Sequence, residues 1–409
     1  MLIRLAWRNL WRQKRRTLLT SSALALALFL SLMTRSFQEG SYSANIENSA
    51  RFYTGLIQLQ HPDFYTSNSI DDLLPESADF IQSALNLPNV ETALPRLESV
   101  ALAAFAERSK GVLVLGVNPQ AEDEYSRISA KLISGRFITA GEQGVLLGES
   151  LARYMQVALG DELVLYGQGY HGQTAAGLYQ IVGILHFPLQ QLDSQLVYMP
   201  IQTAQSLYSA QGMVSNWVLD IKQLKQLDST LATLKDQYQA KASVKSWQDL
   251  SPEMAQQIMM DKAGGIFLVY VLYGVVGFGL FATILMMTLE RQREFAVMLA
   301  TGMLRRKLAA LIMVESSFIA CLGITLGLII SAPVLAYFYF NPIRLTGDAA
   351  QLMLDSGFEP IMPVAVDVGL MVSQIATVLL LMLLCLIYPV LRVSRLDVAS
   401  SLKGGAHAG

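Results

Sequence analysis

Apolar residues gather in four long runs along the chain, separated by segments of ordinary polarity. The runs occupy residues Leu18–Met33, Gly264–Leu289, Leu308–Phe340 and Val364–Leu391. A helix needs about 20 apolar residues to cross the hydrocarbon core of a bilayer. Counting the residues that flank each run, we predict four transmembrane helices, at residues 17–37, 263–289, 308–340 and 364–391.

The first apolar run is shorter than the others, about 16 residues, and has the length of the apolar core of a signal peptide. No small-residue A-x-A cleavage pattern follows it, because the next residues are Met33-Thr-Arg-Ser-Phe-Gln-Glu39. The basic segment before it is also long and amphipathic. We therefore interpret this run as a retained membrane helix.

The stretch between the first two runs, residues 38–262, has the composition of a soluble domain. The whole chain is too apolar for a soluble protein of this size, with 53% hydrophobic residues and a mean hydropathy of +0.39. Strand-like and helical runs are interleaved too irregularly for a doubly wound sheet. We predict an α+β domain of two lobes, with strands at 55–60, 100–106, 111–117, 162–167, 179–185, 195–199 and 217–221, and helices at 79–85, 200–209, 230–238 and 252–262.

The charges next to the predicted helices orient the chain, because cytoplasmic segments carry an excess of Lys and Arg. Residues 1–16 have six basic and no acidic side chains, and residues 290–307 have five basic and two acidic. The tail, residues 392–409, has three basic and one acidic. Residues 38–262 carry 14 basic against 24 acidic side chains. We therefore place both termini in the cytoplasm, and the large domain and the loop at 341–363 outside it.

Residues 1–16 read as an amphipathic helix that lies in the membrane interface. Trp7 and Trp11 are one helical turn apart and stand beside Arg8 and Arg12, a combination that suits the headgroup zone. A simpler interpretation is a basic flank that only sets the topology. The two interpretations are compatible.

The segment between the second and third spans, residues 290–307, has charged ends and an apolar centre at Phe295–Ala300. Held between two membrane helices, it is expected to lie at the membrane surface and to contact something outside the bilayer. Glu315 follows about two turns into the third helix, where an ionisable residue is costly. It either snorkels toward the basic residues at 305–307 or ties this segment to the third helix.

Sites for catalysis are not indicated by the sequence. No G-x-x-x-x-G-K-[ST] phosphate loop occurs, so ATP cannot be bound by that route. The four histidines are scattered, and no H-E-x-x-H or Cys/His cluster has metal-ligand spacing. G-Q-G-Y-H-G at Gly167–Gly172 is better explained as a hairpin tip than as a dinucleotide loop. We expect a non-catalytic chain without a metal site.

Several motifs together resemble the FtsX/MacB/LolCE-type permeases of ABC transporters. The pattern E-R-x-R-E-x-A-x-x-x-A-x-G-x-x-R from Glu290 to Arg305, followed by Glu315-Ser, is similar to the family's signature. The opening A-W-R-N-L-W-R-Q-K-R-R-T and the external V-L-L-G-E-S-L-A and L-G-D-E-L-V-L runs also match. So does the closing segment, although Val398 stands where proline is usual. A large external domain without an ATPase in the same chain is most like the LolC/LolE-type lipoprotein-releasing subunits.

The resemblance implies a permease subunit of the mechanotransmission type, in which a separate ATPase drives work outside the cytoplasm, most simply the release of lipoproteins or other lipophilic cargo. The alternative is an FtsX-like signalling protein that regulates a cell-wall hydrolase and moves no cargo. The residues expected to couple to the ATPase are Glu290, Arg291, Arg293, Glu294, Ala300, Gly302, Arg305 and Glu315. A candidate cavity for acyl chains, which ordinary helix packing explains equally well, would be lined by Phe267, Tyr270, Val271, Gly274 and Phe278.

The family also implies partners and a location. The expected partners are a cytoplasmic ABC ATPase dimer that binds ATP and Mg, a second permease subunit, identical or not, a periplasmic carrier or adaptor, and membrane lipids. No cofactor is expected on this chain and no nucleic acid as a partner. The expected location is the bacterial inner membrane, with the large domain in the periplasm.

Overall fold

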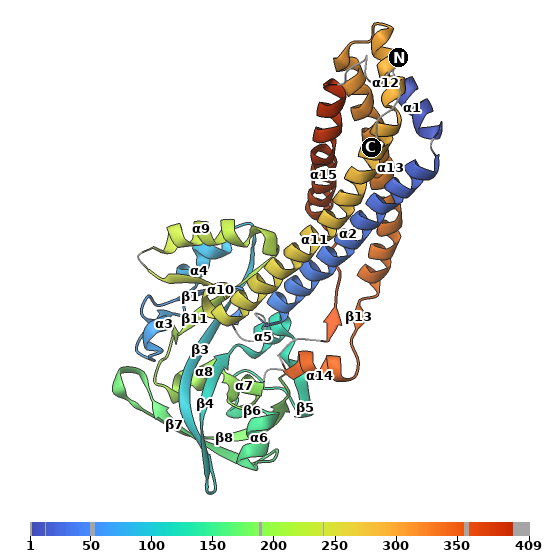
Figure 1. The fold of residues 1–409 in the computed structure, drawn as a ribbon. Coiled ribbons are helices and arrows are strands. Elements are labelled where there is room, and N and C mark those ends of the chain that lie inside the picture. Colours follow the sequence, from blue (N-terminus) through green and yellow to red (C-terminus); the bar gives the residue numbers. More distant parts are fainter. Residues whose placement is uncertain are drawn as a thin grey trace. The chain divides into compact units, whose positions relative to one another are not determined.

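A computed structural model describes residues 2–12, 14–49, 54–187, 190–239, 241–355 and 360–395 (Figure 1). The chain divides into two compact units. The helical unit comprises Met1–Ser41, Ile258–Ile343 and Met362–Gly409, and the sheet unit comprises Tyr42–Gln257 and Arg344–Ile361. Most of the predicted cytoplasmic tail, from residue 396 onward, lies outside the described residues.

Four helices among the described residues are long and apolar enough to cross a membrane, as predicted. They are α2, α11, α13 and α15, and two shorter helices, α1 and α12, accompany them in the helical unit (Figure 1). Their bounds are α1 (Leu2–Arg12), α2 (Lys14–Ser49), α11 (Pro252–Glu290), α12 (Gln292–Ala300), α13 (Arg305–Phe340) and α15 (Val368–Ser394). α2 and α11 each extend well beyond the predicted spans.

Helices α2 and α13 pack closely through two glycines one turn apart on α13. A Cβ atom added at Gly323 would lie 3.0 Å from the Ser21 carbonyl oxygen, and one at Gly327 would lie 3.1 Å from the Ala25 carbonyl oxygen. Small residues allow such close backbone approach between membrane helices. The Ser21 hydroxyl also donates to the Ile319 carbonyl at 3.3 Å. This contact fixes α13 against α2.

A polar link joins three of the long helices inside the apolar core. The hydroxyls of Ser31 on α2 and Tyr273 on α11 are 2.7 Å apart, and the Tyr273 hydroxyl donates to the Gln374 side chain of α15 at 3.0 Å. All three residues are buried. Polar groups in an apolar interior must be hydrogen-bonded to each other, so this chain of bonds specifies how α2, α11 and α15 face one another.

One ten-stranded mixed sheet organises the sheet unit. Its order is β12-β1-β11-β3-β4-β9-β6-β8-β5, and β7 pairs with both β3 and β8. β4 is parallel to β9 and β6 to β8. The strands are β1 (Ile57–Gln60), β3 (Val90–Phe105), β4 (Arg108–Val117), β5 (Leu132–Gly135), β6 (Gly144–Gly148), β7 (Glu162–Gln168), β8 (Thr174–Leu185), β9 (Leu196–Pro200), β11 (Asn216–Ile221) and β12 (Ser243–Ser246).

The centre of this sheet is buried on both faces. Neighbouring residues of a strand point to opposite faces, and in β6 Leu146 and Leu147 belong to two different hydrophobic clusters. Val197 and Tyr198 of β9 divide between the same two clusters. The unit therefore has two cores on one sheet. Its division into two lobes stays a prediction.

The shorter elements complete the fold. The remaining helices are α3 (Phe64–Ser67), α4 (Ala78–Leu85), α5 (Pro119–Ser126), α6 (Glu149–Met155), α7 (Gln190–Asp193), α8 (Ile201–Leu207), α9 (Leu227–Tyr238), α10 (Trp247–Leu250) and α14 (Asp348–Asp355), and the remaining strands are β2 (Leu74–Pro75), β10 (Met213–Val214), β13 (Ile343–Arg344) and β14 (Ile361–Met362). Each strand and helix predicted within residues 38–262 overlaps an observed one, whereas β5, β6, β12, α5 and α6 were not predicted.

A buried ion pair lies between β3 and α5. Arg96 and Glu122 have side chains that are 0% and 1% exposed. The Arg96 Nε and Nη2 groups donate to the two carboxylate oxygens of Glu122 at 3.0 and 2.6 Å. Bidentate geometry of this kind satisfies both partners, so α5 is held at one orientation on the sheet.

Candidate functional site

The charged segment between the second and third spans forms the short helix α12, set between the end of α11 and the start of α13. The start of its apolar centre turns inward, because Phe295 and Ala296 are buried. The helix ends where Gly302 adopts a φ of +95°, in the left-handed region. A glycine at this position after the last helical turn is a common helix terminator, which explains the glycine of the motif.

Glu315 on α13 is the inner end of a charged network. Its carboxylate accepts hydrogen bonds from Arg291 Nη1 and from the Asn9 side-chain amide, both at 2.7 Å. The side chains of Arg291 and Glu315 are 9% and 14% exposed. Glu315 therefore links the charged segment to the third helix, which was one of its two interpretations, and is not paired with the basic residues at 305–307 among the described contacts. The residue that makes this link is Arg291, before α12.

Arg291 continues the network toward the surface. Its Nε donates to Glu294 at 3.1 Å, and its guanidinium lies 5.1 Å from the ring centre of Phe295. Glu294 also pairs with Arg12 of α1. Burial opposes ionisation of Glu294, but the hydrogen bonds from Arg12 and Arg291 outweigh it and hold the pKa of this carboxyl below its usual value. Glu294 is therefore an anion with two cationic partners at neutral pH.

A second pair joins the start of α2 to the end of α11. Both guanidinium Nη groups of Arg16 donate to the carboxylate of Glu290, one of them at 2.8 Å. Arg12 and Arg16 thus bind residues of the segment at 290–307, and Asn9 binds Glu315 on α13. None of the three was predicted as a site residue. The available signal was the charge balance, because residues 1–16 contain six basic and no acidic side chains, whereas the segment at 290–307 contains Glu290 and Glu294.

The other predicted coupling residues are placed differently in the described part of the chain. Arg293, Ala300 and Gly302 are exposed. Arg305 donates from Nη1 to the Ser394 carbonyl at 2.8 Å, in the last turn of α15. The predicted set therefore separates into an inward group that fixes α12, a link to α15, and an outward group that is free to meet a partner.

The five residues predicted to line a cavity lie on one exposed face of α11. Phe267, Tyr270 and Phe278 are 66%, 64% and 75% exposed, and Val271 is 48% exposed. A Cβ added at Gly274 would meet no atom within 4 Å among the described residues. In this single chain the face is uncovered, so a cavity there would need a second chain or lipid as its other wall.

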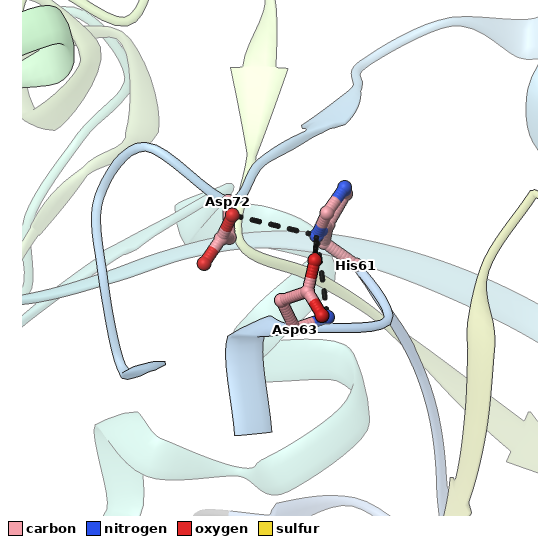
Figure 2. Close-up of side chains that lie close together, drawn as sticks. All are labelled: His61, Asp63 and Asp72. Atoms are coloured by element: carbon pink, nitrogen blue, oxygen red, sulfur yellow. Dashed lines mark hydrogen bonds and ion pairs between the residues drawn. The ribbon is translucent and has the colours of Figure 1, made fainter. Parts of the chain in front are cut away.

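One cluster in the sheet unit has the composition of a metal site (Figure 2). The ligand atoms of His61, Asp63 and Asp72 lie within 4.8 Å of one another. His61 Nδ1 is 3.5 Å from Asp72 Oδ1 and 3.8 Å from Asp63 Oδ2. One nitrogen and two carboxylate oxygens suit a divalent ion such as zinc, and they also form ion pairs when His61 is protonated. The sequence motifs considered above, H-E-x-x-H and Cys/His spacing, do not include a cluster of one histidine and two aspartates.

The chain matches two family models in succession. Residues 17–249 match the MacB-like periplasmic core domain, and residues 266–398 match the FtsX-like permease C-terminal domain. The lipoprotein-releasing system transmembrane protein LolC of Neisseria meningitidis serogroup B is 23% identical over 270 residues, covering 64% of this chain. The chain spans 65% of the length of that relative. LolC of Xylella fastidiosa strain 9a5c is 23% identical over 78% of this chain and 79% of its own.

Two solved structures are also similar to part of this chain. The periplasmic region of MacB from Actinobacillus actinomycetemcomitans matches 50% of this chain and 93% of its own, with 15% identity and a TM-score of 0.35. The extracellular domain of the transporter YknZ from Gram-positive bacteria matches 47% of this chain and 99% of its own, with 15% identity and a TM-score of 0.34. From the two family models and the LolC relatives, the chain belongs to the FtsX/MacB/LolCE type of ABC transporter permeases, with a MacB-like periplasmic core domain between its first two spanning helices.

Proposed function

We propose that this chain transmits the work of a separate cytoplasmic ATPase, which binds ATP and Mg, across the membrane to its own external domain. In this proposal α12 and both chain termini lie in the cytoplasm and the sheet unit lies in the periplasm. A second permease subunit completes the transporter. The observation that carries the proposal is the two-sided character of α12, which is tied by ion pairs on one side and exposed on the other.

The inward side of α12 is suited to pass on a displacement. Arg291 connects it to α13 through Glu315, and Glu294 connects it to α1 through Arg12. The pair of Arg16 and Glu290 joins α2 to the end of α11. Because α1 and α13 are held to α12 and its N-terminal flank, and α2 is held to the preceding end of α11, a force on α12 would move these helices together. α11 then continues without interruption from Glu290 to Pro252.

The outward side of α12 is suited to docking. Arg293, Val297 and Ala300 are exposed and follow a spacing of four and three residues, which places them on one helical face. Leu304, in the turn between α12 and α13, is also apolar and 64% exposed. A short helix with apolar and basic residues on its free face fits a groove on a partner protein. We propose that the partner that binds this face of α12 is the ATPase.

The coupling role is tested in proteoliposomes that contain the chain with its ATPase. We expect Glu294→Lys to lower cargo release at least tenfold while the protein inserts and folds, because the introduced ammonium group would repel Arg12 and Arg291. Val297→Asp should instead prevent copurification of the ATPase. The control is Glu107→Lys, an exposed residue in the turn between β3 and β4. Unchanged ATPase stimulation and unchanged release with Glu294→Lys would refute the coupling role.

We further propose that the cargo is a lipoprotein or another lipophilic molecule. The similar proteins named as lipoprotein-releasing support this assignment, and the exposed apolar face of α11 offers a surface for acyl chains. A photo-crosslinker at Phe278 should capture a lipoprotein acyl chain, whereas one at Leu384 of α15, also exposed at 56%, should capture only bulk lipid. Equal capture at both positions, together with binding of a cell-wall hydrolase, would favour the signalling alternative.

A further inference from the structure

A basic groove lies where α1 meets α2. It is lined by Trp11, Arg12, Lys14, Arg15, Arg16 and Glu290 and has a volume of about 580 Å³. Its lining holds four cationic side chains against one carboxylate, a net charge of +3. This imbalance favours an anionic ligand, because neighbouring like charges repel unless an anion stands between them.

Two of the four cations are already paired and two are not. Arg12 pairs with Glu294, and Arg16 pairs with Glu290. Among the described residues no acidic partner is found for Lys14 or Arg15, and Lys14 instead lies 5.5 Å from the ring centre of Trp11. Lys14 and Arg15 therefore supply the free positive charge, while the lone carboxylate of the groove is already satisfied.

The surroundings of the groove are those of a membrane surface. Ile3, Trp7 and Trp11 are exposed at 65%, 51% and 55% and recur every fourth residue, which forms an apolar stripe along α1. Tryptophan beside Arg and Lys is characteristic of interfacial helices. Leu18 and Leu19, one turn into the spanning helix α2, are 54% and 72% exposed. A ligand in the groove would thus have apolar surface on the side of the bilayer.

We propose that this groove binds the headgroup of an anionic phospholipid, with its phosphate between Lys14 and Arg15 and its acyl chains against Leu18 and Leu19. A zwitterionic lipid fits less well, because Arg16 already occupies the carboxylate that would receive its ammonium group. A soluble phosphate lacks the apolar contacts. The bound lipid would anchor the α1–α2 junction, from which Arg12 and Arg16 hold the coupling segment. The site requires that α2 span the membrane and does not depend on ATPase coupling.

The test uses the full-length chain in nanodiscs, with Trp7→Phe so that Trp11 is the fluorescent tryptophan of α1. Bromine on the acyl chains quenches a tryptophan that it contacts, and Trp217 and Trp247 are buried in the sheet unit. At equal mole fraction we expect brominated phosphatidylglycerol to associate with Trp11 roughly 25-fold more strongly than brominated phosphatidylcholine. The double variant Lys14→Gln with Arg15→Gln should abolish this preference, because each charge removed should lower the relative affinity for phosphatidylglycerol roughly fivefold.

The control is Arg306→Gln with Lys307→Gln, which removes the same charge from exposed residues outside the groove. This variant should keep the preference for phosphatidylglycerol. Equal quenching by the two lipids in the parent protein, or loss of preference in the control, would overturn the site. Displacement by millimolar glycerol phosphate would reassign it to a soluble phosphate. None of these readouts uses the ATPase, so their failure is distinguishable from failure of the coupling proposal.

Discussion

Each of the two units contains a buried arginine that pairs with a carboxylate. The two arrangements differ in whether the ion pairs stay buried or extend to the protein surface. In the sheet unit Arg96 and Glu122 form a closed pair, with both side chains at most 1% exposed. In the helical unit Arg291 and Glu315 are nearly buried, but the network continues to Glu294, which is 42% exposed, and to Arg12, which is 59% exposed.

This difference separates a structural ion pair from one suited to transmission. A closed pair is costly to form and to break, so it can hold only one geometry. A network that runs from a buried carboxylate to the surface can exchange its outer partners at small cost, because exposed ion pairs contribute roughly 0–1 kcal/mol. In the proposed coupling, the inner end would keep α12 in place while the outer end responds to a partner.

The largest effect is expected in the closed pair. Glu122→Ala would remove the carboxylate that forms the bidentate pair with the buried Arg96 guanidinium and should destabilise the sheet unit by about 3–5 kcal/mol. The double variant Arg96→Met with Glu122→Leu should recover most of this loss. The measurement is the unfolding transition followed by the fluorescence of Trp217 and Trp247, both buried in the sheet unit. A single variant with an unmoved transition would contradict the structural role.

In the helical network the same substitutions should separate stability from function. Glu315→Ala should destabilise the helical unit by roughly 1–3 kcal/mol, since Arg291 keeps Glu294 as a partner. Arg291→Met with Glu315→Leu should restore the thermal stability of the purified protein in detergent but not cargo release in proteoliposomes. Wild-type release in the double variant would mean that this network, like Arg96 and Glu122, is only structural.

The sequence predicts the spanning helices well and the network only in part. Apolar runs long enough to cross a bilayer identify α11, α13 and α15, and α2 follows from its shorter run together with the basic segment before it and the missing cleavage pattern. Glu315 was singled out because a charge in a membrane helix needs a partner. Its actual partners, Arg291 and Asn9, depend on how α1 and α12 pack against α13, and that packing has no local signature.

Three strands of the sheet, β5, β6 and β12, were not predicted, and they have no more than five residues each. β6, Gly144–Gly148, is apolar throughout and shows no period of two. Its following helix, α6, is stabilised from a distance, because the Asp193 carboxylate accepts from the backbone amides of Glu149 and Ser150 at 3.2 and 2.8 Å. Because this capping residue is 43 residues from Ser150 in the sequence, it cannot be predicted from the residues at the helix start.

The outer part of the helical network should tolerate reversal of charge. Arg16→Glu alone would face Glu290 with a like charge and should lower cargo release, with a stability change of about 1 kcal/mol or less. Arg16→Glu with Glu290→Arg restores opposite charges and should recover release. Cargo release by the two variants in proteoliposomes tests whether opposite charges at these positions are sufficient. Equal defects in both variants would show that orientation, and not charge, matters there.

The smallest effect is expected at Glu98, a half-buried acid of β3 beside Arg96. Its Oε1 is buried without a hydrogen-bond partner among the described residues, and burial raises the pKa of this carboxyl despite the charge of Arg96. This is the opposite of Glu294, whose pKa the network lowers.

A carboxyl with a raised pKa in the folded state favours folding while it is protonated, and this contribution is lost as the pH rises through the folded pKa. Glu98→Gln imitates the protonated form. Its stability relative to the parent protein should therefore increase slightly between pH 4 and pH 8, measured by the unfolding midpoint. Glu91→Gln, an exposed residue of the same strand, serves as the control. If Glu98→Gln were instead progressively destabilising toward pH 8, the charge of Glu98 would belong to the closed ion pair, and the contrast between the two units would rest on three buried charges instead of two.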